Sequence, residues 1–308
     1  MSSIFAIAGP TCIGKTALSL NLAKQLNAEI ISVDSALVYR HLNIGSAKPT
    51  LEEMGEIRHH LLDIRDPWES YSVSDFMSDA TSAINDIHER GKRVLLVGGT
   101  MLYFKGLIEG LSCLPAANIE IRQKLQYQLN HDGLTSLYQR LQLCDPITAN
   151  QLHANDQQRI MRALEVTISS GQPYSEMLKL HPNINGLGSQ IKMVGLVPNN
   201  RADLHENIAY RFELMCKHGF LDEVRLLKAM PNMHPDLPSM RSVGYRQAWQ
   251  YLEGDYDYVT FVEKGIVATR QLAKRQLTWI RNWSHPYELV MMPNDQVINR
   301  LLSYFSKL

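Results

Sequence analysis

The stretch GPTCIGKT, from Gly9 to Thr16, constrains the fold of this chain more than any other feature. It fits the pattern of glycine, four residues, then glycine-lysine-threonine, which surrounds phosphate groups with backbone N–H groups. The apolar run SIFAIAG precedes it and the helically spaced TALSLNLAKQL follows it, which is the strand-loop-helix context that such a loop needs. The alternative is a chance strand-turn-helix match. The sequence predicts a diphosphate-binding loop made of Gly9, Pro10, Thr11, Cys12, Ile13, Gly14, Lys15 and Thr16.

Further apolar runs place this loop in a sheet. AEIISV and RVLLVG read as buried parallel strands, and the helical stretch DFMSDATSAINDIHERG lies between them and ends at Gly91. We therefore expect an α/β fold, a P-loop core with a doubly wound parallel sheet and phosphate chemistry at the carboxyl edge of its strands.

The composition and the predicted secondary structure of the chain change at about Asn118. Glutamine-rich helical runs follow one another without strand signals until IKMVGLVP, which returns the chain to the sheet, and the remainder reads as mostly helical. We expect a catalytic core of residues 1–116 and 198–308 with C-terminal helices, and a helical insertion domain over residues 117–197.

Composition excludes some functions and leaves others open. The 31 basic and 31 acidic side chains balance, so any surface for nucleic acid must be a local basic patch. The four cysteines form no CxxC pair, which argues against structural zinc and a disulfide framework and favours a cytoplasmic protein. No segment approaches the roughly 20 apolar residues of a membrane span, so we expect no membrane partner.

Four residues beyond the loop's glycines are candidates for chemistry. Lys15 would reach the phosphates and the Thr16 hydroxyl would ligate Mg²⁺. RVLLVGGT ends in Gly98, Gly99 and Thr100, where a nucleotide hydrolase would carry a magnesium-binding aspartate. An aspartate instead follows the second strand, and Asp34 would project over the loop. Capping of a following helix by Asp34, and a turn role for Thr100, are open alternatives.

Several motifs together identify a family. GPTCIGKT, DSALVYR, SAKPT, GGTMLY, HANDQQRIMRALEV, RSVGYRQ and ATRQLAKRQLTWIR occur in that order over most of the chain. In this it resembles the tRNA dimethylallyltransferase family, the tRNA isopentenyltransferases. The departures are Cys12 and Ile13 in place of alanine and serine, SAKPT for TAKPT, and HAND for HPND. None of these removes a group to which chemistry is assigned.

The resemblance implies a prenyltransferase reaction. A dimethylallyl group would pass from dimethylallyl diphosphate to N6 of adenine 37 in the tRNA anticodon stem-loop, and diphosphate would be released. Asp34 would be the general base. Thr100 would donate toward the bridging oxygen, and Lys15, Arg211 and Mg²⁺ near Thr16 would stabilise the remaining charge on the diphosphate. A surface helix arginine is the alternative reading of Arg211.

The adenine would have to leave the anticodon loop and close the pocket against water. The resemblance implies tRNA contacts from the insertion domain and from these residues: Asp34, Ser35, Ala36, Leu37, Thr100, Arg122, Gln157, Gln158, Arg159, Ile160, Met161, Arg241, Ser242, Val243, Gly244, Tyr245, Arg246, Lys274, Arg275, Gln276, Leu277, Thr278, Trp279, Ile280 and Arg281. Arg162 belongs to the same block of the insertion.

The last long helical run also has a charge pattern. At about 100° per residue, Arg270, Lys274 and Arg281 lie within about 40° of one another. We expect Ala268, Leu272, Trp279 and Trp283 to pack inward on the opposite side. An ordinary solvated amphipathic helix is the alternative.

Other interpretations remain open. The adjacent His59 and His60 match a family motif, and we read them as structural residues rather than metal ligands, because successive side chains point to opposite faces of a strand. Since the loop is typical of nucleotide-binding, ATP-binding proteins, a small-molecule kinase is one rival function. A non-catalytic RNA-binding protein with a nucleotide ligand is another. We expect a monomer.

Overall fold

The computed structural model describes residues 4–283, 285, 287–292 and 296–306. The chain divides into two compact units, which we call the core (Met1–Ile108 and Leu187–Leu308) and the insertion (Glu109–Gly186). The insertion thus begins before residue 117 and ends before residue 197, the limits expected from the sequence. The difference at its end arises because residues 191–198 form a buried strand of the core.

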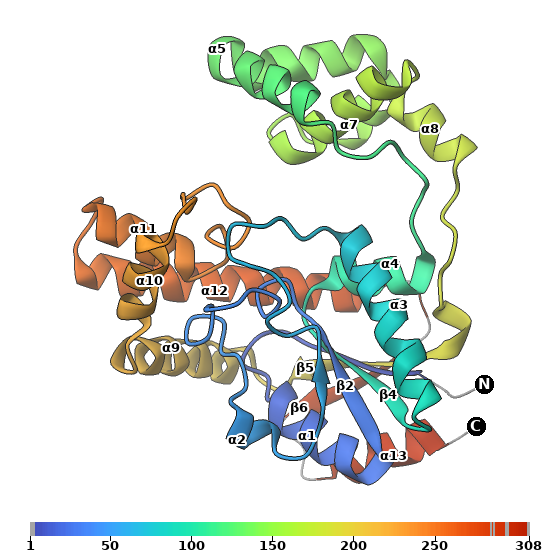
Figure 1. Cartoon of the computed structure of the whole chain (residues 1–308), viewed down its shortest axis with the longest axis vertical. Helices are drawn as coiled ribbons and strands as arrows, with labels where there is room; N and C mark the ends of the chain where they lie inside the picture. Colours follow the sequence, from blue (N-terminus) through green and yellow to red (C-terminus); the bar gives the residue numbers. More distant parts are fainter. Residues whose placement is uncertain (1–3, 284, 286, 293–295, 307–308) are drawn as a thin grey trace. The chain divides into compact units, whose positions relative to one another are not determined.

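The core is built on a six-stranded, all-parallel sheet (Figure 1). Its order is β3-β2-β4-β1-β5-β6, with bounds β1 Ile4–Ala8, β2 Ala28–Val33, β3 His59–His60, β4 Arg93–Gly98, β5 Ile191–Pro198 and β6 Tyr287–Met292. This confirms the predicted α/β fold. Every residue of β1 and β2 is buried, as the apolar runs required. Edge strand β6 was missed, since the sequence after β5 was read as mostly helical.

Helices cover this sheet and extend beyond it (Figure 1). Those of the core are α1 Lys15–Leu26, α2 Leu51–Met54, α3 Val73–Glu89, α4 Met101–Glu109, the short η1 Gly188–Gln190, α9 Arg201–Lys217, α10 Phe220–Ala229, α11 Tyr245–Glu253, α12 Tyr258–Arg281 and α13 Val297–Ser306. Helix α3 begins with a capping box of Ser72 and Asp75. It is followed by Gly91 at φ 69°, which explains why the sequence located its end correctly.

The insertion has a hydrophobic core of its own. Its helices are α5 Ile119–Cys144, α6 Pro146–Gln151, α7 Gln157–Ser170 and α8 Tyr174–Leu180. Gly133 interrupts α5 at φ 77°, so two predicted helical runs lie on either side of a break. The buried residues are Leu125, Leu137, Leu141, Ala149, Ile160, Ala163 and Leu164. An antiparallel bridge between Leu111 and Ile184 holds the two ends of the unit together.

Two buried carboxylates organise the insertion. Glu165, 2% exposed, accepts hydrogen bonds from the Arg122 and Arg162 guanidinium groups and from the Asn118 N–H. Asp145 accepts from the N–H and hydroxyl groups of both Thr148 and Ser175. Burial alone would raise the pKa of each carboxyl, but these hydrogen bonds outweigh it and hold each pKa below its usual value.

Candidate functional site

Three loops leave the sheet side by side. Ala8 of β1 pairs with Gly98 of β4, which pairs with Val33 of β2. Because these neighbouring strands are parallel, the next residues along the chain emerge at the same edge and level. The phosphate loop, Asp34 and the Gly99–Thr100 turn therefore leave the sheet next to one another at the same edge.

The backbone of the phosphate loop has the shape that its glycines allow. Gly14, the N-cap of α1, has φ 90°, and Cys12 has φ 63°. A Cβ on Gly9 would lie 3.0 Å from Ile13 Cγ2 and 3.1 Å from Leu196 Cβ, closer than normal packing. The α1 N-terminus that follows carries free N–H groups and partial positive charge. These features favour an anion over the loop.

Lys15 is half-buried, and its side chain folds back onto the loop. Its ammonium group donates to the carbonyl groups of Gly9, at 2.9 Å, and Pro10, at 2.7 Å. Burial lowers the pKa of Lys15 to about 8; Asp34 opposes the shift and the Arg211 guanidinium adds to it. Arg211 is half-buried on α9, and its positive charge contributes to the lowered pKa of Lys15.

Asp34 fixes a turn but keeps one oxygen available. Its Oδ1 accepts from the Ala36 N–H at 2.8 Å and the Leu37 N–H at 3.4 Å. No helix follows it, because residues 35–40 form bends and turns with an isolated β-bridge at Tyr39, so the alternative of a helix N-cap does not hold. Within the described residues, Oδ2 accepts no hydrogen bond and the side chain is half-buried. The carboxylate is oriented and retains a free acceptor.

Thr100 connects the turn after β4 to the segment after β2. Its N–H donates to the Val33 carbonyl at 3.2 Å, and its Oγ1 accepts from the Ser35 N–H at 3.0 Å. The hydroxyl donates toward Ser35 Oγ at 3.4 Å, a long contact. Thr100 is therefore held next to Asp34 with a hydroxyl proton in only a weak interaction.

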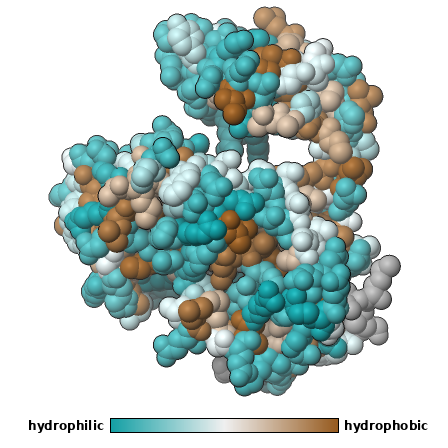
Figure 2. Space-filling view, in the orientation of Figure 1, coloured by the Kyte–Doolittle hydropathy of each residue, from teal (hydrophilic) through white to brown (hydrophobic). Residues whose placement is uncertain are grey.

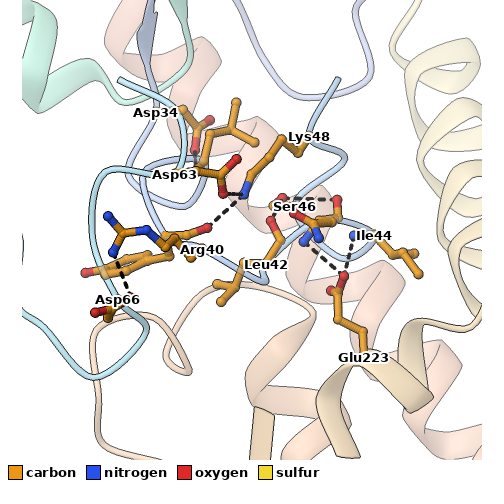
Figure 3. Close-up of polar contacts among 12 residues, drawn as sticks. Asp34, Arg40, Leu42, Ile44, Ser46, Lys48, Asp63, Asp66 and Glu223 are labelled. Atoms are coloured by element: carbon orange, nitrogen blue, oxygen red, sulfur yellow. Dashed lines mark hydrogen bonds and ion pairs between the residues drawn. The ribbon is translucent and has the colours of Figure 1, made fainter. Parts of the chain in front are cut away.

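A polar network supports the segment that follows Asp34 (Figure 3). The Lys48 side chain, 6% exposed, donates to the Tyr39 carbonyl and pairs with Asp63. Glu223 of α10 accepts from the N–H groups of Asn43, Ile44 and Gly45. The SAKPT motif indicates no role for Lys48 by itself, and no local pattern in the sequence predicts the contacts of Glu223.

Gln276 was expected to contact tRNA, but its side chain lies inside the core. It is 8% exposed; its Oε1 accepts from the Thr11 N–H and its Nε2 donates to the Gly99 carbonyl, both at 2.9 Å. Its α12 neighbours Leu277 and Ile280 are also buried. The side chains of these three residues pack the core instead of facing a ligand surface.

The packed face of α12 differs from the one predicted. Trp279 is 37% exposed, whereas Ala273, Gln276 and Ile280 are buried. Trp283 is half-buried and lies edge-on to Phe104. The buried stripe is instead formed by Ala273, Gln276, Leu277 and Ile280.

The predicted basic stripe is also shorter than expected. Arg270 is half-buried: its guanidinium donates to the His205 carbonyl, and its Nε is buried without a partner among the described residues. Lys274, Arg275 and Arg281 are exposed, as is Thr278. The exposed part of the predicted stripe is therefore limited to Lys274 and Arg281, in the C-terminal half of α12.

Other predicted tRNA residues divide between exposed and buried positions. Gln157, Gln158 and Arg159 are exposed in the first turn of α7, Met161 is half-buried and Ile160 is fully buried. Arg122 pairs with Glu165, and about half of its side chain is exposed.

The RSVGYR segment is divided in the same way. Arg241 and Arg246 are exposed, Ser242 and Val243 are half-buried, and Gly244 is buried with φ 91°. Tyr245 is buried, and its hydroxyl donates to Glu223. Its side chain therefore supports the Glu223 network.

The histidine pair has structural partners. His59 bonds to the Ile57 carbonyl and His60 to Glu29, in line with the structural interpretation. No group of three or more His, Cys, Asp or Glu side chains suitable for a metal occurs among the described residues. The Thr16 hydroxyl, exposed at the start of α1, has no partner in that part of the chain.

The surface gives two further observations. Hydrophilic side chains dominate the visible faces, with smaller apolar patches between them (Figure 2). No helix in the described ranges is long and apolar enough to cross a membrane.

Comparison with known proteins agrees with this geometry. A family model described as IPP transferase matches residues 37–283. The tRNA dimethylallyltransferase of Francisella philomiragia is 55% identical over 302 residues, 98% of each chain. Another relative, from Francisella tularensis subspecies novicida, is 54% identical over the same share.

Solved structures show the same fold. The tRNA isopentenylpyrophosphate transferase of Bacillus halodurans is 35% identical and superposes with a TM-score of 0.72, covering 100% of this chain and 98% of its own. A eukaryotic dimethylallyltransferase, solved acting on tRNA, is 27% identical with a TM-score of 0.77, over 94% of this chain and 74% of its own. This chain belongs to the tRNA dimethylallyltransferase family, whose members transfer a prenyl group to tRNA.

Proposed function

We propose that this chain transfers a dimethylallyl group from dimethylallyl diphosphate to N6 of adenine 37 in the tRNA anticodon stem-loop. The observation that carries the proposal is the convergence of the phosphate loop, Asp34 and Thr100 at one level of the sheet edge. A phosphate cradle, a free carboxylate oxygen and a hydroxyl donor are the groups that this substitution needs.

In the reaction, N6 attacks C1 of the dimethylallyl group while the bond from C1 to the bridging oxygen breaks. The electron pair of that bond leaves with the diphosphate, and one N6 proton must depart. Asp34 accepts this proton through Oδ2, since Oδ1 is engaged by the turn. Its oriented carboxylate also aligns the amino group before attack.

Charge on the departing diphosphate is stabilised from several sides. The hydroxyl of Thr100, held only weakly by Ser35 Oγ, can turn to the bridging oxygen. Lys15 can exchange its loop carbonyl partners for phosphate oxygens, and Arg211 adds a second positive charge. The α1 N-terminus supplies the remaining N–H donors.

A magnesium ion is the cofactor we propose. The exposed Thr16 hydroxyl fits it, because Mg²⁺ needs few protein ligands when phosphate oxygens and water complete its octahedron. When bound, the ion would neutralise charge on the diphosphate.

For tRNA binding, we propose the exposed polar residues on the predicted segments. These are Gln157, Gln158 and Arg159 of α7, Arg241 and Arg246, and Lys274, Arg275, Thr278 and Arg281 of α12. An extruded adenine would then close the prenyl pocket against water. A monomer, which size-exclusion chromatography would check, and a cytoplasmic location remain predictions.

The test is to incubate the protein with unmodified tRNA, Mg²⁺ and dimethylallyl diphosphate and to measure nucleoside masses after digestion. The expected product is adenosine with one dimethylallyl group in place of an N6 hydrogen, in molar balance with diphosphate. A parallel reaction with ATP and nucleosides tests the kinase alternative. Unmodified tRNA with phosphorylated nucleosides would overturn the proposal, and tight tRNA binding without any mass change would support the non-catalytic alternative.

A further inference from the structure

We propose that Gln276 is a positioning residue that locks the phosphate loop to the Gly99–Thr100 turn, and so sets the distance between the two groups of donors to the diphosphate. This inference rests on the proposed function, because it assigns Gln276 a role in that same site.

The chemistry of the two partners suits a carboxamide. The Thr11 N–H can only donate and the Gly99 carbonyl can only accept, so the side chain between them must offer one acceptor and one donor. Gln276 offers both, and it is buried, so water does not compete readily for either bond. A leucine or methionine would leave both backbone groups without partners.

Each bond acts on a different part of the site. Thr11 precedes Cys12, which has φ 63°, so fixing the Thr11 N–H stabilises the loop where its backbone turns sharply. Gly99 precedes Thr100, so holding the Gly99 carbonyl fixes the peptide that carries the Thr100 hydroxyl. One side chain of α12 thus joins the loop after β1 to the turn after β4.

The space around Gly99 supports this role. A Cβ on Gly99 would collide with Gln276 Nε2 and would lie 3.1 Å from the Gly9 carbonyl oxygen. The absence of a side chain at Gly99 therefore lets the Gln276 amide reach the backbone. Any larger residue there should displace the amide.

The positioning matters because charge develops on the diphosphate while the carbon-oxygen bond breaks. Donors in fixed places stabilise that charge without reorganising, and a shift of about 1 Å can cost about 10²-fold in rate. Loss of the lock should therefore lower kcat more than it raises the KM for dimethylallyl diphosphate.

The main variant is Gln276→Met, which keeps the length of the side chain and removes both hydrogen bonds. Gln271→Met is the matched control, since Gln271 is exposed on the same helix. We would measure kcat and KM, the Kd of inorganic diphosphate by calorimetry, the Kd of tRNA and the melting temperature. We expect a kcat lower by about 10- to 100-fold, diphosphate binding weaker by about 5- to 10-fold, and an unchanged Kd of tRNA.

A second variant keeps the proposal testable if Gln276→Met folds poorly. In Gln276→Glu, an ionised carboxylate repels the Gly99 carbonyl, but a protonated one accepts from Thr11 and donates to Gly99. The kcat of this variant, divided by that of the parent at each pH, should rise as the pH is lowered from about 8.5 to about 6. Dividing by the kcat of the parent at the same pH removes the pH effects that both proteins share, such as ionisation of the diphosphate. A ratio that does not depend on pH would contradict the proposal that residue 276 must both accept from Thr11 and donate to Gly99.

A double-mutant cycle adds an independent test. Gly99→Ala should reproduce the kcat defect by displacing the amide, and it should cost much less in a Gln276→Ala background, where the collision is absent. Additive effects would overturn the inference.

The outcomes separate the inference from the proposed function. A parent that binds no diphosphate and modifies no tRNA would overturn the proposed function and the inference with it. If the parent is active and Gln276→Met retains its kcat and diphosphate affinity, the inference alone fails. A weakened Kd of tRNA with unchanged diphosphate binding would also overturn it, because Gln276 would then act as a tRNA contact.

Discussion

The polar side chains of the insertion and those at the edge of the core sheet differ in how completely they are hydrogen-bonded within the protein. In the insertion, Glu165 receives hydrogen bonds from two arginines and a backbone N–H, and Asp145 receives four. At the sheet edge, Asp34 keeps a free oxygen and Thr100 keeps a weakly bound hydroxyl proton. Charges that are fully bonded within the protein stabilise it, and those that are oriented but incompletely bonded remain available for a substrate.

The carboxyl groups of the insertion and Lys15 of the core have shifted pKa values for different reasons. The pKa values of Glu165 and Asp145 are held below their usual values, because local donors stabilise the ionised forms. Lys15 has a pKa lowered to about 8, because burial outweighs the attraction of Asp34. A group destabilised in its charged form gains when an anion arrives, which is the behaviour expected of a binding site.

The largest expected effect is on catalysis at Asp34. Asp34→Asn should lower the rate of prenyl transfer by about 10³- to 10⁴-fold, because the amide keeps the turn but accepts no proton. The Kd of tRNA and the melting temperature should change little. Single-turnover kinetics with tRNA in excess would measure the rate, and near-parental turnover would exclude Asp34 as the base.

Thr100 should have the next largest effect. Thr100→Ala should reduce kcat by about 10² to 10³, as removal of an oxyanion donor does, and Thr100→Ser should retain most of it. Steady-state kinetics with varied dimethylallyl diphosphate would separate kcat from KM. A rise in KM alone would mean that Thr100 contributes only to binding.

Removing the charge of Glu165 should lower stability rather than the rate of the chemical step, unlike the changes at Asp34 and Thr100. Glu165→Gln should destabilise the insertion by about 3 kcal/mol, since buried ion pairs cost about 3–5 kcal/mol to break and both arginines remain partly solvated. Hydrogen exchange of the insertion amides would report this locally. A substitution of Glu176, whose 47% exposed side chain pairs with Lys179, is the control and should cost under about 1 kcal/mol.

This carboxylate also predicts a pH dependence. The folded pKa of Glu165 is depressed, so its stabilisation is present above the unfolded pKa of about 4.3 and is lost as the pH falls through the folded value. The parent insertion should therefore lose stability on acidification below about pH 4.3. Denaturant titrations should show a smaller loss for Glu165→Gln, and parallel pH profiles would contradict the assignment.

Parts of the fold followed directly from sequence, for local reasons. The strand-loop-helix pattern at Gly9–Thr16, the end of α3 before Gly91 and the strand at 191–198 are each specified by neighbouring residues. The convergence of Asp34, Thr100 and the phosphate loop also followed, since parallel strands share a carboxyl edge.

The remainder depends on contacts between distant residues. Glu223 meets the N–H groups of residues 43–45 across some 180 positions of sequence, and Gln276 meets Thr11 across 265. The periodicity of apolar residues along the chain reports local structure and does not predict such long-range contacts. Gln276 did have one overlooked signal, because it shares a helical stripe with Ala273, Leu277 and Ile280, where a polar residue needs an internal partner.

The smallest expected effect is at the exposed end of α12. Replacing Lys274 and Arg281 together with glutamine should weaken tRNA binding regardless of tRNA sequence, and should reduce the salt slope of log Kd by up to about two units. Diphosphate binding should not change. The matched control replaces Lys24 and Arg93, which are exposed at the amino end of the sheet. If the two double variants have equal salt slopes of log Kd, the C-terminal end of α12 is an ordinary solvated surface that does not bind tRNA.

The most direct test of this comparison measures single-turnover prenyl transfer and melting for two isosteric variants, Asp34→Asn and Glu165→Gln. With saturating tRNA, below the melting transition of either variant, Asp34→Asn should lose transfer by at least about 10³-fold with parental stability. Glu165→Gln should melt earlier and transfer at the parental rate. Loss of the chemical step in folded, tRNA-bound Glu165→Gln, or its retention in Asp34→Asn, would contradict the division between structural and catalytic charges.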